Sequence, residues 1–66
     1  MEPKYEDITV NLSNRDGNAM AVMAAVTQAL RQAGVSEEER SAYFKEATSG
    51  DYDNVLATTL RWVNVT

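Results

Sequence analysis

The sequence predicts a mostly helical α+β domain in the order strand–helix–helix–helix–strand, with a small two-stranded sheet on a three-helix core. Three observations lead to this fold class. Apolar and polar residues alternate over residues 7–12, which is typical of a half-buried strand. Apolar residues then recur at helical spacing in three segments, which are separated by Gly34 and Gly50. The last five residues, 62–66, have the composition of a strand.

The whole chain, residues 1–66, is expected to form one small domain, because typical domains run about 100–150 residues. Residues 1–6 are expected to be disordered or loosely held. A lone two-stranded ribbon is only marginally stable, so the helices have to bury most of the apolar surface. Either very efficient packing or a second subunit then completes the fold.

The first strand places Ile8, Val10 and Leu12 on one side of the chain. Residues 13–17 have turn chemistry and end this strand. We expect the two terminal strands to pair, within one chain or between two chains, and to lie across the helices.

The first helix is predicted from about Asn18 to Ala33, with Asp16 or Asn18 as its cap. Gly34 suits the left-handed position that ends a helix. One face of this helix is apolar and is expected to be buried. Its members are Ala19, Val22, Met23, Val26, Ala29, Leu30 and Ala33.

The second helix is predicted from Glu37 to Ala47. Ser36 and Glu39 form a capping box, in which each side chain accepts from the other residue's backbone amide. The acidic residues of the first turn also suit the positive end of the helix dipole. We expect Tyr43, Phe44 and Ala47 to be buried.

The third helix is capped by Asp51 or Asp53 and carries an apolar stripe at helical spacing. The residues of this stripe are Tyr52, Val55, Leu56, Thr59, Leu60 and Val63. Trp62 falls away from Leu56 and Leu60 on the helical wheel, and we expect it to pack in the core under the adjoining strand.

Composition excludes several classes of function. The chain holds no cysteine and no histidine, which excludes disulfides, thiol nucleophiles, serine–histidine triads and histidine-based zinc sites within one chain. A net charge of −4 disfavours binding to nucleic acid or to anionic membranes. We therefore predict no enzyme, no catalytic residue, no cofactor and no metal site. Without a membrane span or a signal sequence, a cytoplasmic location is expected.

The outer side of the first helix is the strongest candidate for a binding surface. Met20, Ala21, Ala24 and Ala25 lie outside the apolar stripe, and Arg31 is the only charged residue of this helix. A solvated helix face usually carries several charges. One interpretation is a central helix wedged between the other elements. The other is an interface with a second copy or another protein, formed by Met20, Ala21, Ala24, Gln28 and Arg31.

Two alternative functions remain open at this point. The net charge suggests an acidic inhibitor or nucleic-acid mimic that binds a basic enzyme. Residues 42–61 could also form a helix-turn-helix that binds DNA. Asp51 and Asp53 would then face phosphates with the wrong sign, which argues against DNA binding.

Several short blocks resemble a family of small uncharacterised proteins of unknown function that occurs in bacteria and in phage or prophage genomes. The blocks are residues 16–19, 31–36, 46–53 and 61–63, and the similarity runs from Val10 onward. The resemblance implies an accessory protein of phage origin, whereas the prediction of protein–protein interaction comes from the outer side of the first helix. It implies no activity, ligand or catalytic residue.

Overall fold

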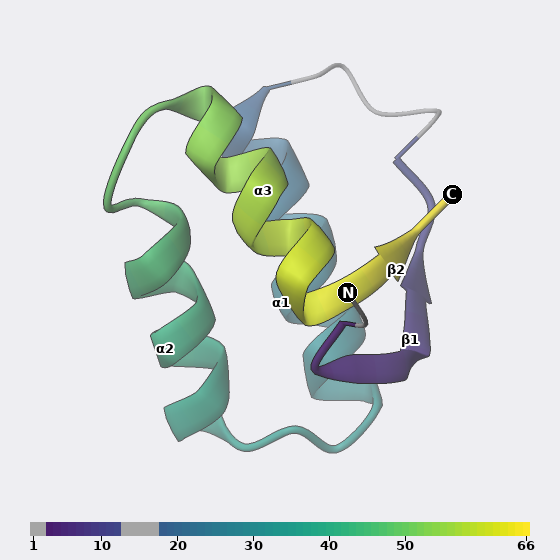
Figure 1. Ribbon diagram of the computed structural model, residues 1–66. Coiled ribbons are helices and arrows are strands. Elements are labelled where there is room, and N and C mark those ends of the chain that lie inside the picture. Colours follow the sequence, from purple (N-terminus) through teal and green to yellow (C-terminus); the bar gives the residue numbers. More distant parts are fainter. Residues whose placement is uncertain (1–2, 13–17) are drawn as a thin grey trace.

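A computed structural model describes residues 3–12 and 18–66 and confirms the predicted fold class. Two short strands from opposite ends of the chain lie beside a three-helix core (Figure 1). The elements are β1 (Tyr5–Val10), α1 (Ala19–Gln32), α2 (Glu37–Ala47), α3 (Tyr52–Trp62) and β2 (Val63–Val65). The predicted turn at 13–17 lies outside the described residues.

The two strands pair in parallel within one chain. Thr9 lies opposite Asn64 and Val10 opposite Val65, with an irregular register between Tyr5 and Thr9. β1 begins two residues earlier than predicted, so part of the segment that we expected to be loosely held belongs to the strand. The amide of Lys4 also donates to the Arg61 carbonyl at 2.8 Å. Both ends of the chain are thereby attached to the same side of the helices.

The caps of α1 and α2 follow the sequence prediction. The Asn18 side chain accepts from the Met20 amide at 2.8 Å, and Ser36 accepts from the Glu39 amide at 3.2 Å. Gly34 has a φ of 85°, in the left-handed region. The Glu39 carboxylate, predicted to complete a capping box, instead accepts from the Tyr5 hydroxyl at 2.7 Å.

A side chain of α3 closes the C-terminal end of α2. Asp51 caps α3 by accepting from the Asn54 amide at 3.1 Å. The Asn54 side chain then donates to the carbonyls of Glu46, at 2.9 Å, and Ala47, at 3.2 Å. These two carbonyls are among the last four of α2 and have no partner within their own helix. One residue therefore joins the start of α3 to the end of α2.

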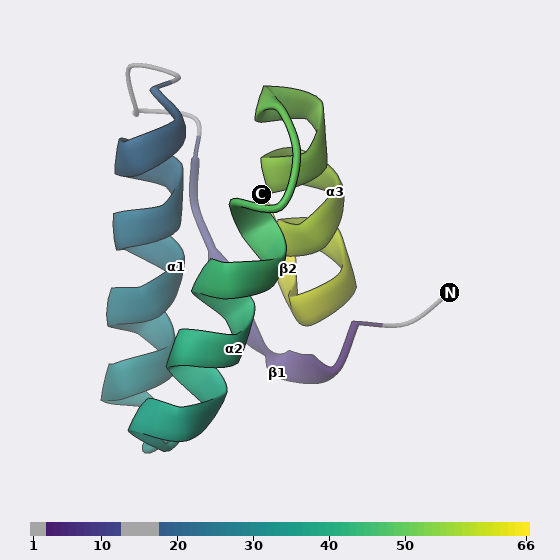
Figure 2. The same ribbon diagram turned by 90° about the vertical axis from the view of Figure 1, so that its left-hand side faces the viewer.

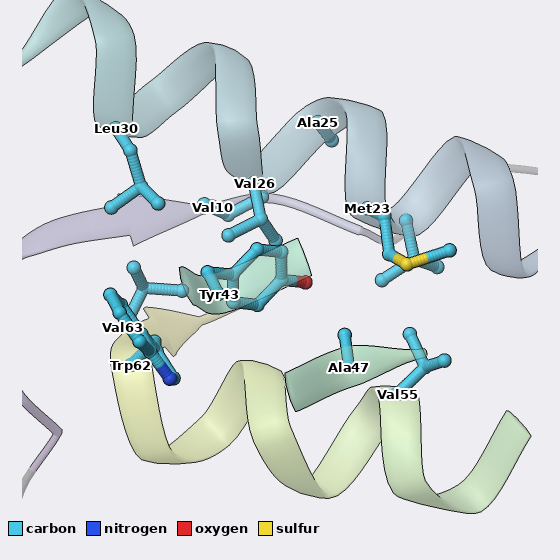
Figure 3. Close-up of a cluster of buried hydrophobic side chains, with 11 residues drawn as sticks. Val10, Met23, Ala25, Val26, Leu30, Tyr43, Ala47, Val55, Trp62 and Val63 are labelled. Atoms are coloured by element: carbon cyan, nitrogen blue, oxygen red, sulfur yellow. The ribbon is translucent and has the colours of Figure 1, made fainter. Parts of the chain in front are cut away.

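The core fills the space that the three helices and the sheet enclose (Figure 3). Tyr43 lies at its centre and is fully buried. Its ring packs edge to face against the Trp62 ring, and the two ring centres lie 5.7 Å apart. The Tyr43 hydroxyl lies 2.7 Å from the Thr59 hydroxyl, which itself donates to the Val55 carbonyl at 2.8 Å. Because Thr59 uses its only hydrogen there, Tyr43 is the donor to Thr59.

Trp62 is 5% exposed, which confirms that it belongs to the core, but the predicted stripe of α3 is partly wrong. The buried face of α3 comprises Val55, Thr58, Thr59 and Trp62. Leu60 and Trp62 are two residues apart, so their side chains point about 200° apart around the helix. Because Trp62 is buried, Leu60 points outward. Leu60 is 60% exposed and Tyr52 is 39% exposed.

Candidate protein-binding surface

The exposed face of α1 carries most of the residues that we predicted as an interface. Met20 is 61% exposed, and Ala24, Gln28 and Arg31 are exposed as well. These residues follow one another at intervals of three or four, so they form one line along the helix. Ala21 is half-buried at the edge of this line.

The wedged interpretation of α1 is wrong for this face, although it holds for one neighbouring alanine. α2 and α3 cover the inner side of α1, and β1 lies along a further side (Figure 2). Ala25, which we expected outside the core stripe, is 8% exposed and shares a hollow with Val10 of β1. Ala33, which we expected to be buried, is exposed at the end of α1. The line from Met20 to Arg31 stays open to solvent.

α2 adds an aromatic residue that we expected in the core. Phe44 is 41% exposed, whereas its neighbour Tyr43 is fully buried. Adjacent helical residues point about 100° apart, so turning Tyr43 into the core directs Phe44 toward the rim. There it lines a groove of about 520 Å³ with Thr27 of α1 and Arg40 of α2.

A second groove of about 310 Å³ adjoins the first. It is lined by Ala24, Thr27, Gln28, Arg31 and Arg40. Thr27 and Arg40 line both grooves, so the two form one continuous depression between α1 and α2. We define the α1–α2 surface as the four residues of the exposed line of α1 together with two residues of α2 that line the depression. They are Met20, Ala24, Gln28, Arg31, Arg40 and Phe44.

Positive charge is concentrated at this surface although the chain as a whole is acidic. Among the described cations, Lys4 pairs with Glu39 and Arg61 with Glu46. Arg31, Arg40 and Lys45 form no ion pair with any described residue, and all three line the two grooves. Glu37 is the one carboxylate lining either groove. Arg31 and Arg40 therefore carry charge that no described carboxylate pairs with, whereas Lys45 also lines a groove with Glu37 and Glu38.

Another polar cluster, beneath the N-terminal segment, stabilises the fold. The Tyr5 ring stacks on Trp62 at 5.9 Å, and Lys4 Nζ lies 4.5 Å from the centre of the Trp62 ring. Hydrogen bonds from Lys4 and Tyr5 lower the pKa of the Glu39 carboxyl. The bond from Arg61 likewise lowers the pKa of Glu46. These groups stabilise one another, and Lys4 and Tyr5 also line a hollow of about 560 Å³ beside Gly34.

No centre for metal chemistry is visible among residues 3–12 and 18–66, where no three acidic side chains come close enough to hold an ion. The described helices include none long and apolar enough to cross a membrane. The carboxylate of Asp51 is instead occupied as the cap of α3, where it accepts from the Asn54 amide.

Sequence reasoning located the α1 part of the surface but missed Arg40 and Phe44. No local signal separates Phe44 from Tyr43, because Ala47 stands three residues after Phe44 and four after Tyr43, and both spacings place residues on one helix face. Comparison of the chain with protein families, curated proteins and solved structures finds no match. The resemblance to bacterial and phage proteins therefore remains a prediction.

Proposed function

We propose that the chain is a small non-catalytic interaction protein, an accessory protein of phage or prophage origin, that binds another protein through its α1–α2 surface. One observation carries the proposal: Met20 and Phe44 are 61% and 41% exposed, and Phe44 lines the groove between α1 and α2. Exposed apolar residues that border a depression are typical of interaction sites.

The residue types of the surface support this function. Methionine adapts its shape to a partner, and aromatic residues and arginine are enriched at the centres of protein interfaces. Arg31 and Arg40 line one groove with the small side chain of Ala24, and Phe44 lines the adjoining groove. Met20 is exposed one helical turn before Ala24. Because Arg31 and Arg40 form no ion pair with the described residues, we expect the bound surface to present carboxylates.

Less supports the two alternative functions. An acidic inhibitor would bind through a patch of free carboxylates, but Glu39 and Glu46 are paired internally. The exposed Glu37 and Glu38 share their groove with the cation Lys45. A helix-turn-helix would use α3 as its recognition helix, and Asp53 stands in its first turn. Carboxylates at that position repel phosphate groups.

The experiment is quantitative capture of proteins from a lysate of the source cells on the immobilised chain. We expect the wild-type chain to retain a partner that the Ala24→Glu variant loses. Glutamate is a good helix former, and Ala24 is exposed, so the fold should be unaffected.

Ala42→Glu is the matched control, because Ala42 is an exposed alanine on α2 that lines neither groove of the α1–α2 surface. It should retain the same partner. A partner that Ala24→Glu retains as well as the wild type does would contradict the proposed surface.

A further inference from the structure

The outer side of α3 presents an apolar line that no described element covers. Tyr52, Leu56 and Leu60 follow one another at i, i+4 and i+8. Leu60 is 60% exposed and Tyr52 39%, while Leu56 is half-buried. Beside this line lie the exposed residues Asp53, Ala57 and Arg61. We call these six residues the α3 stripe.

We propose that the α3 stripe binds a second copy of the chain, with the two α3 helices antiparallel about a two-fold axis at Leu56 and Ala57. The spacing of the residues carries this inference. Tyr52 and Leu60 stand four residues before and after Leu56, so each is about 6 Å from it along the helix. With the axis midway between Leu56 and Ala57, an antiparallel copy sets Tyr52 of one chain within about 1.5 Å of the height of Leu60 of the other.

The charges of the stripe are complementary in the same arrangement. Asp53 and Arg61 stand four residues before and after Ala57, so the same axis sets Asp53 of each copy within about 1.5 Å of the height of Arg61 of its partner. Within the described residues, Arg61 donates through Nε and Nη2 to Glu46 and Thr58. Its Nη1 is left for the carboxylate of the second copy. A parallel pairing would instead set like charges together.

The size of the stripe sets the strength that we expect. Standard stable interfaces bury about 800 Å² on each partner, and one face of a three-turn helix offers less. The dimer should therefore dissociate on dilution. The small side chain of Ala57 allows the two helices to approach closely near the axis. α1 and α3 lie on different sides of the molecule (Figure 2), so dimerisation leaves the α1–α2 surface accessible.

The first test is the molar mass by light scattering over a concentration series. We expect the wild-type mass to rise from one chain toward two, and the Leu60→Glu variant to remain a monomer. Met20→Glu is the matched control, because Met20 is 61% exposed and Leu60 60%. It should dimerise as the wild type does. A monomer at every concentration overturns the proposal, as does a dimer lost in Met20→Glu and kept in Leu60→Glu.

The second test examines the register of the two helices. The chain contains no cysteine, so a single introduced one reports one position. Ala57→Cys lies near the axis, where two Cα atoms come within the roughly 7 Å that a disulfide requires. We expect this variant to form a disulfide dimer under mild oxidation well before Ala24→Cys does. Equal rates would overturn the antiparallel arrangement while leaving the proposed function of the α1–α2 surface untouched.

Discussion

At the scale of single residues, Tyr43 occupies the position on which the core depends. It is fully buried, packs against Trp62 and donates to Thr59. Burial also raises the pKa of its phenol, so the hydroxyl stays protonated and remains a donor. A buried hydroxyl without a partner would cost free energy, and Thr59 supplies the acceptor. Thr59 therefore lies in the buried, mostly apolar face of α3 because it accepts the hydrogen bond of Tyr43 on α2.

Replacing Tyr43 by phenylalanine tests this hydrogen bond alone, because the ring is kept. We expect Tyr43→Phe to lower the free energy of unfolding by about 1 kcal/mol, the usual net value of a neutral hydrogen bond. Urea unfolding followed by the fluorescence of Trp62, the single tryptophan, measures the change. The control is Tyr52→Phe on the exposed side of α3, which should change stability little. An equal loss in both variants would argue against a special role for the Tyr43 hydroxyl.

At the scale of elements, local patterns predicted much of the fold. Asn18, Ser36 and Gly34 mark helix ends through their own backbone chemistry, and the structure places all three as expected. The rotation of each helix was harder to predict. Whether Phe44 or Leu60 is buried depends on where Tyr43 and Trp62 pack, and those contacts join residues far apart in the chain.

The candidate site shows the same division. The low charge of α1 is visible in its own sequence, so Met20 and Ala24 could be singled out from it. Arg40 and Phe44 join them only because α2 packs beside α1 and leaves a groove. No local pattern reports which of two helices will border a depression.

The contact between α2 and α3 through Asn54 is a second feature that sequence reasoning missed, and it can be tested. Asn54→Asp keeps the shape of the side chain but removes the two donated bonds to Glu46 and Ala47. It also sets a negative charge against the negative end of the α2 dipole. We expect a loss of about 1–2 kcal/mol in unfolding free energy at neutral pH. Asp53→Asn, one residue earlier, is the control for altered charge in the same turn and should cost less.

At the scale of the whole molecule, the two ends of the chain and the α2–α3 pair are joined by polar contacts on one side. Glu39 receives Lys4 and Tyr5 from the N-terminal segment. Glu46 accepts a hydrogen bond from Arg61 at the end of α3, and a longer one of 3.4 Å from Nε1 of Trp62. The α1–α2 surface has no comparable network. The molecule therefore uses two of its carboxylates for stability, whereas Arg31 and Arg40 form no ion pair with the described residues.

These two carboxylates predict how stability depends on pH. Both have a pKa below the ordinary value in the folded chain, so the folded state binds fewer protons than the unfolded state in acid. Their contribution is complete above the ordinary glutamate pKa of about 4.3 and is lost as the pH falls through the lower folded values. We expect the urea midpoint to decrease between neutral pH and about pH 3.

Glu39→Gln identifies the source of that decrease. The variant should be less stable than the wild type at neutral pH and should lose less stability in acid, because one of the two titrating contacts is gone. Glu38→Gln is the matched control, since Glu38 is exposed and forms no ion pair with the described residues. Its acid dependence should follow that of the wild type. If Glu39→Gln and the wild type lost equal stability between neutral and acid pH, the contact of Glu39 with Lys4 and Tyr5 would not hold the N-terminal strand in place.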